Sequence, residues 1–245
     1  MKYLFFLVFF SFAIGNVTAQ TQVMVRAKAK NAKFIGSSIG GAKIIIRDYY
    51  SNSILAEGIT KGATGNTDLL IKQPVIRGKR LTDEKTAGFL ANLDIKKPTF
   101  VEIEAFAPIA KKQAVVKAAT QMWILPHKDI LGDGVMLEIP GFIVDILSPQ
   151  THEIIQGEFE VSANIVMMCG CPVAEGGLWD ASTYEIKALL ENGETAKEVE
   201  LKATEKANTF SATVNLNAGN YSVTVYAFDT KTGNTGLDKT SIIVR

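Results

Sequence analysis

Alternation of apolar and polar residues constrains the fold of this chain more than any other feature. Residues 99–106 read Thr-Phe-Val-Glu-Ile-Glu-Ala-Phe, and residues 42–47 form another strand-like, β-branched run. Because residues i and i+2 of a strand share a face, such runs predict half-buried strands. Turn residues such as Gly40-Gly41 and Gly65-Asn66 separate them, and helical periodicity is scarce. The chain is therefore predicted to be all-β.

Turn-forming residues gather between residues 126 and 141, which include Gly132-Asp133-Gly134 and Pro140-Gly141. Short apolar runs continue on both sides of this stretch, with turn signals between them. Strands of this length and spacing are typical of β-sandwiches. We predict two β-sandwich domains in tandem, residues 20–126 and 142–245, with a linker at 127–141.

Several runs resemble known sandwich families. Residues 142–245 resemble the immunoglobulin-like modules of bacterial surface proteins, most clearly in 144–149, 159–163 and the run Ala-Gly-Asn-Tyr-Ser-Val-Thr-Val-Tyr-Ala-Phe-Asp at 218–229. The N-terminal part is similar to transthyretin-like, carboxypeptidase-regulatory-like sandwiches, in 41–48, 54–60 and 62–65. The resemblances imply folds only, because such folds carry many unrelated functions.

The first 19 residues have the pattern of a secretory signal peptide. Lys2 is followed by an apolar run from Leu4 to Ile14, and Val17-Thr18-Ala19 supplies compact residues before a cleavage site at Gln20. No later stretch is long and apolar enough to span a bilayer. We therefore expect a periplasmic or secreted protein without a membrane span.

Charge and motif content narrow the function classes. The formal net charge is +1, which gives no global basic footprint for nucleic acid. The chain contains no Gly-x-Ser-x-Gly nucleophile elbow, no zinc-protease histidine pair and no glycine fingerprint of a nucleotide site. We expect a protein that is not an enzyme and has no cofactor, unless it binds copper as described next.

The two cysteines of the chain stand together in Met167-Met168-Cys169-Gly170-Cys171. On a strand, Cys169 and Cys171 would point to the same side, beside Met167. One interpretation is a local disulfide between Cys169 and Cys171, and another is free or intermolecular thiols. A third is a soft-metal site in which Met167, Cys169 and Cys171, with His152, bind Cu(I), because sulfur ligands favour that ion.

Three functions follow from these observations. The leading hypothesis is a non-enzymatic exported protein that binds another protein or a component of the cell envelope. The second is a copper-binding protein, and the third is a thiol redox protein that uses a Cys169–Cys171 bridge. Trp123 and Trp179 are expected to pack in a core or between domains rather than to form sugar-stacking platforms.

Overall fold

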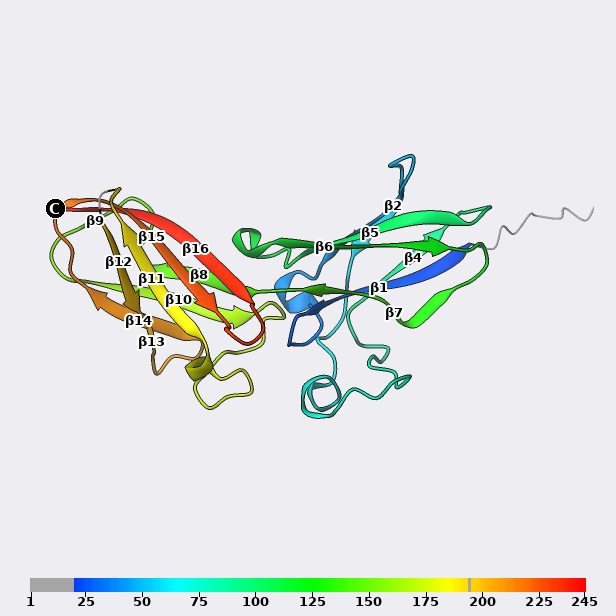
Figure 1. Cartoon of the computed structure of the whole chain (residues 1–245), viewed down its shortest axis with the longest axis horizontal. Coiled ribbons are helices and arrows are strands. Elements are labelled where there is room, and N and C mark those ends of the chain that lie inside the picture. Colours follow the sequence, from blue (N-terminus) through cyan, green and yellow to red (C-terminus); the bar gives the residue numbers. More distant parts are fainter. Residues whose placement is uncertain (1–19, 194) are drawn as a thin grey trace, which may run out of the picture.

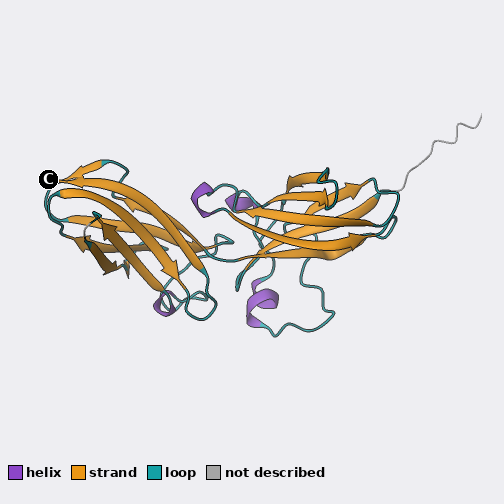
Figure 2. Ribbon diagram, turned by 45° about the horizontal axis from the view of Figure 1, so that its top comes forward, coloured by secondary structure: helices purple, strands orange, loops and turns teal. Residues whose placement is uncertain are grey.

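A computed structural model describes residues 20–193 and 195–245. The predicted signal peptide, residues 1–19, lies outside the described residues. Strands dominate, and the helical segments are single turns such as Ser37–Ile39 and Asp68–Lys72 (Figure 2). The strands form four sheets that pair into two sandwiches, arranged end to end (Figure 1). The all-β, two-sandwich fold predicted from alternation is confirmed.

The N-terminal sandwich consists of two sheets with the orders β4-β1-β7 and β3-β2-β5-β6. Strand β1 is antiparallel to β4 and parallel to β7. In β5 the alternation works as expected, since Val101 and Ile103 are buried between the sheets and Glu102 faces outward. The strands are β1 (Thr21–Ala29), β2 (Lys43–Asp48), β3 (Ile54–Ile59), β4 (Phe89–Leu93), β5 (Thr99–Ala107), β6 (Val116–Ile124) and β7 (Ile130–Ile139).

The predicted linker at 127–141 is wrong, because most of it is strand β7. Its register with β1 jumps from Val23↔Ile130 to Val25↔Val135, so the glycine-rich segment bulges out of the pairing. Gly132 and Gly134 have φ values of 69° and 66°, which suit such a bulge. The turn signals therefore marked an irregularity within a strand rather than its absence. The connection between the sandwiches shrinks to Pro140 and Gly141, between β7 and β8.

The C-terminal sandwich packs the sheet β13-β14-β10-β8 against the sheet β12-β11-β15-β16-β9. Strand β8 is antiparallel to β10, and β9 then pairs in parallel with β16 in the opposite sheet. The strands are β8 (Phe142–Ser148), β9 (Glu153–Ile155), β10 (Phe159–Met167), β11 (Glu185–Glu191), β12 (Ala196–Glu200), β13 (Lys202–Ala203), β14 (Thr209–Val214), β15 (Gly219–Phe228) and β16 (Thr235–Val244).

This strand order is immunoglobulin-like. The first strand is split between the two sheets, and the remaining strands separate into the two layers typical of that sandwich. A tyrosine corner is also present, because the Tyr221 hydroxyl near the start of β15 donates to the Asn217 carbonyl at 3.1 Å. The two cysteines lie next to each other, so they do not form the inter-sheet bridge of antibody domains.

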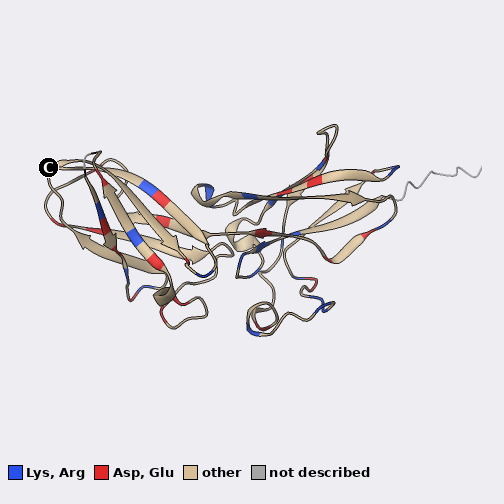
Figure 3. Ribbon diagram, in the orientation of Figure 1, with Lys and Arg blue, Asp and Glu red and all other residues tan. Residues whose placement is uncertain are grey.

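Charged side chains of both signs are interspersed along both sandwiches (Figure 3). No helix among residues 20–193 and 195–245 is long and apolar enough to cross a membrane. One continuous cluster of buried apolar residues extends from the N-terminal sandwich, for example Ile35, through Ile139 into the C-terminal sandwich at Phe142. The two sandwiches therefore share packed surface where they meet.

Candidate functional site

The cysteines lie in a tight turn at the end of β10. The Gly170 N–H donates to the Met167 carbonyl at 2.7 Å, and the Met167 N–H donates to the Cys171 carbonyl at 3.0 Å. Pro172 then forms an antiparallel bridge with Val166, so the chain reverses direction. The turn brings the Cys169 and Cys171 Cα atoms to 5.3 Å, and their Sγ atoms are bonded. The straight strand geometry that we expected is replaced by this reversal.

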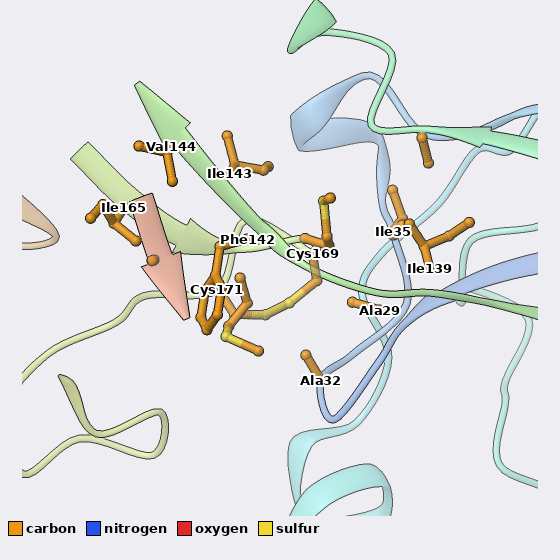
Figure 4. Close-up of a cluster of buried hydrophobic side chains, with 14 of the residues drawn as sticks. Ala29, Ala32, Ile35, Ile139, Phe142, Ile143, Val144, Ile165, Cys169 and Cys171 are labelled. Atoms are coloured by element: carbon orange, nitrogen blue, oxygen red, sulfur yellow. A yellow bond between two sulfur atoms is a disulfide. The ribbon is translucent and has the colours of Figure 1, made fainter. Parts of the chain in front are cut away.

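This cysteine turn is packed into the junction between the sandwiches. Cys169 and Cys171 are only 1% and 4% exposed. Figure 4 shows them beside Phe142 of the C-terminal sandwich and facing Ile35 and Ala32 of the N-terminal one. A Cβ atom built on Gly170, whose φ is 73°, would lie 2.7 Å from the Ile39 side chain. The turn therefore contributes to contact between the sandwiches.

The residues predicted to bind copper are not all brought together. Met167 adjoins the cysteines, but His152 lies beside Ser241, to whose carbonyl its backbone N–H donates at 2.6 Å. Ser241 is six residues along β16 from Thr235, which borders the junction, or about 20 Å at the rise of a strand. Within the described ranges no group of three His, Cys, Asp or Glu side chains is placed to hold a metal ion.

Trp179 and Asn234 are among the further side chains that connect the sandwiches. Trp179 is 5% exposed, and its indole N–H donates to the Asn31 carbonyl of the N-terminal sandwich at 2.9 Å. The prediction that Trp179 packs between domains is confirmed. The Asn234 side chain, fully buried, accepts from the Gly141 N–H at 3.0 Å and donates to the Lys30 carbonyl at 3.1 Å.

Trp123 does not pack in a core, and this prediction is wrong. It is 56% exposed on the outer face of the β3-β2-β5-β6 sheet. Phe100 is its direct partner on β5, and the Tyr49 N–H donates to the Phe100 carbonyl at 2.9 Å, which places Tyr49 on the other side of Phe100. Tyr50, in the following turn, is 76% exposed. We call these four residues the aromatic surface.

The four rings contact one another and border a groove. The Phe100 ring centroid lies 5.2 Å from that of Trp123 and 5.3 Å from that of Tyr49, and Tyr50 lies 5.4 Å from Tyr49. The groove has a volume of about 610 Å³, within the range of small-molecule sites. Its lining combines three of the rings with polar side chains, namely Asp48, Tyr50, Ser51, Lys97, Pro98, Thr99, Phe100 and Trp123.

The turn that carries Tyr50 is held by Asp48. The Asp48 carboxylate accepts from the Ser51 N–H at 2.8 Å and the Tyr50 N–H at 3.0 Å. These bonds, first among them that from Ser51, lower the pKa of Asp48. Because the carboxylate stays ionised and its acceptor bonds fix the backbone, the turn presents Tyr50 in a defined place.

A polar row follows the aromatic surface on the same face. Arg47 on β2 pairs with Glu102 on β5, and Glu102 pairs with Gln121 on β6. These three residues form a row across the sheet, next to the row of Phe100 and Trp123 on the same face. Beyond them, Glu104 accepts from Lys117 at 2.9 Å and from Arg47 at 3.1 Å. Burial by itself raises the pKa of Glu104, but these bonds outweigh it and the net shift is downward. The face therefore changes from aromatic to charged within two residues of each strand.

The sequence contains a signal for this surface in the strand phase of its aromatic residues. Phe100 has the same strand phase as Glu102 and Glu104, so the alternation that buries Val101 and Ile103 turns Phe100 outward. On β6, Trp123 likewise shares its phase with Lys117 and Gln121. An aromatic residue in the outward phase of a strand was the available signal.

By sequence, the chain matches no known protein family and no curated protein. Among solved structures it is similar to fibronectin(III)-like modules of Clostridium thermocellum CbhA, at 12% identity and a TM-score of 0.30, over 91% of this chain and 90% of that one. An I-band fragment of titin matches at 16% identity and a TM-score of 0.26, over 92% and 64%. An engineered protein matches at 15% identity and a TM-score of 0.31, over 46% of this chain but only 22% of that one. These likenesses carry no functional argument.

Proposed function

We propose that this chain is a non-enzymatic, exported binding protein of the cell envelope, whose N-terminal sandwich binds its partner through the aromatic surface. The observation that carries the proposal is the exposure of Trp123 and Tyr50, at 56% and 76%, beside a groove. Large aromatic side chains exposed together are a mark of interaction sites. Trp and Tyr also supply rigid contact area at low conformational entropy cost.

The C-terminal sandwich has a supporting role in this proposal. The junction residues Trp179 and Asn234 bond across to the N-terminal sandwich, and the cysteine turn packs against it. The immunoglobulin-like module thus acts as a spacer with a fixed orientation, and the aromatic surface lies at the end of β5 and β6 away from it (Figure 1). The export pattern of residues 1–19 supports a periplasmic or secreted location.

We further infer that the N-terminal sandwich is a transthyretin-like module. Its support is the pairing of the first and last strands, β1 and β7, in parallel, opposite a four-stranded sheet in the order β3-β2-β5-β6. The assignment concerns the scaffold and leaves the binding surface as argued above.

Co-sedimentation with isolated cell envelopes tests the proposed function. Residues 20–245 should sediment saturably with envelopes of the source organism, and Trp123→Ala should reduce the apparent affinity about tenfold or more, as expected for an aromatic anchor. Phe106→Ala is the matched control, because Phe106 lies on the outer face of β5, the strand that pairs with the strand of Trp123. It is about 20 Å from Phe100, the direct partner of Trp123. The proposal is refuted if the protein stays in the supernatant, or if all three forms sediment equally.

A further inference from the structure

We propose that the aromatic surface binds a single neutral glycan chain. This inference rests on the proposed binding function and names its ligand class. A pyranose ring presents C–H groups on its faces and hydroxyls around its rim, so it needs a flat apolar contact beside groups that both donate and accept hydrogen bonds. The outer face of the β3-β2-β5-β6 sheet offers these two features in adjacent rows.

The apolar contact comes from Trp123, Tyr50 and Phe100, which line the groove. Trp123 and Tyr50 expose more than half of their surface, so ring faces are accessible without any rearrangement of the core. Both side chains have only two rotatable angles, and little entropy is lost when a ligand stacks on them. Because two of the residues that line the groove are themselves exposed, the groove lies at the surface of the sandwich and a segment of a longer chain can reach it.

The polar contact comes from the row Arg47, Glu102 and Gln121. It begins two residues further along each strand, which corresponds to about 7 Å and is within reach of a sugar hydroxyl. The Gln121 amide already donates to the exposed Glu102 carboxylate at 3.3 Å, which aligns a planar acceptor and a planar donor. Guanidinium, carboxylate and amide groups together supply the donors and acceptors that a hydroxyl-rich ligand requires.

Charge favours a neutral ligand. The groove lining contains one basic residue, Lys97, and one acidic residue, Asp48, so its formal charges balance. The polar row likewise contains one basic residue, Arg47, and one acidic residue, Glu102, so it favours neither an anionic nor a cationic polymer. An extended apolar partner would instead have to cover the ion-paired Arg47, Glu104 and Lys117, and removing such charges from water is unfavourable. A ligand that carries hydroxyl groups around an apolar face can contact both the aromatic surface and the polar row.

The relative orientation of the rings favours a single chain over a flat crystalline surface. The Phe100 and Trp123 planes are inclined by 47°, and those of Tyr50 and Phe100 by 40°. Rings at these angles do not present one plane. They can contact successive sugar units only if the units rotate along the chain, as they do in a soluble polysaccharide.

Affinity gel electrophoresis of residues 20–245 tests this inference, with hydroxyethylcellulose, xylan, galactomannan, laminarin and amylose as the probes. At least one polysaccharide should retard the protein. Trp123→Ala and Tyr50→Ala should each weaken that interaction about tenfold, and Phe106→Ala should leave it within about twofold of the unchanged protein. Microcrystalline cellulose should not pull the protein down. Trp123 emission should shift to shorter wavelength when the retarding polysaccharide is added.

Two treatments of the envelopes separate this inference from the proposed function. Periodate, which cleaves vicinal diols, should abolish sedimentation unless laminarin is the retarding polysaccharide, because its 1,3-linked units lack a vicinal diol. Protease should leave sedimentation intact. If protease alone abolishes sedimentation and Trp123 is still required for it, the proposed binding function stands and the glycan is not the ligand. Lack of retardation by all five polysaccharides, equal retardation of Trp123→Ala, or a dimer that Trp123→Ala dissociates would also overturn it. Correct folding of all three variants is checked by circular dichroism.

Discussion

Asn234 offers the sharpest test of how the two sandwiches are joined. Its side chain is fully buried and hydrogen-bonds the Gly141 N–H and the Lys30 carbonyl. Asn234→Ala removes both bonds. Leaving the buried Gly141 N–H without an acceptor costs about 1–3 kcal/mol of stability. Leaving the half-buried Lys30 carbonyl without its donor costs about 1 kcal/mol, because water can reach it in part. We expect a total loss of about 2–4 kcal/mol, or about 4–16 °C in Tm at about 2–4 °C per kcal/mol.

Urea unfolding followed by circular dichroism measures this loss as a shift in midpoint at constant slope. Asn220→Ala is the matched control, because Asn220 is exposed on β15, and its effect should stay within about 0.5 kcal/mol. Asn234→Asp adds a second measurement, since burial raises the pKa of the introduced carboxyl. A raised folded pKa makes this variant most stable at low pH, and stability falls as pH rises towards that pKa. A loss from Asn234→Ala no larger than the control would refute the bridging role.

Three further outcomes follow from the structure. Tyr221→Phe should cost about 1 kcal/mol in thermal denaturation, because it removes the hydroxyl bond to the Asn217 carbonyl. The pKa of Glu104 is lowered in the folded protein, so its ionised form stabilises the fold above the unfolded pKa, and this effect is lost as pH falls through the folded pKa. The free energies of unfolding of Glu104→Gln and of the unchanged protein should therefore differ at pH 7 and become equal in acid. The double variant Cys169→Ala, Cys171→Ala should still fold and lose about 2–3 kcal/mol in urea, about 1.6 from opening the short loop and the rest from lost burial; absence of a cooperative transition would contradict this.

The strands were predictable because alternation is a local property. Buried and outward positions of β5 follow directly from the order Val101, Glu102, Ile103, Glu104. The extent of β7 was not predictable in the same way, because Gly132 and Gly134 are typical turn residues and their pairing depends on β1, more than a hundred residues earlier in the chain. A bulge within a strand and a turn between domains have the same local composition.

The position of the cysteine turn shows a second limit of sequence. The spacing Cys-x-Cys indicates that the two side chains are close, but it does not indicate what surrounds them. Ile35 and Ala32 come from the other sandwich, and their proximity depends on the two-residue connection at Pro140 and Gly141. His152 was a reasonable candidate ligand by residue type, yet the pairing of β9 with β16 places it along a different strand.

The core of the N-terminal sandwich does not account for the exposed aromatic residues on its outer face. Burying Trp123 and Tyr50 would have been favourable by about 1.5–3 kcal/mol for each side chain, and the inward positions of β5 and β6 instead hold smaller residues such as Val101 and Ile124. The cross-strand contacts among the four rings recover part of that free energy. Since the core is complete without them, stability alone does not account for rings on the outer face. Recognition of a ligand that contacts ring faces accounts for both their exposure and their position beside the row of Arg47, Glu102 and Gln121.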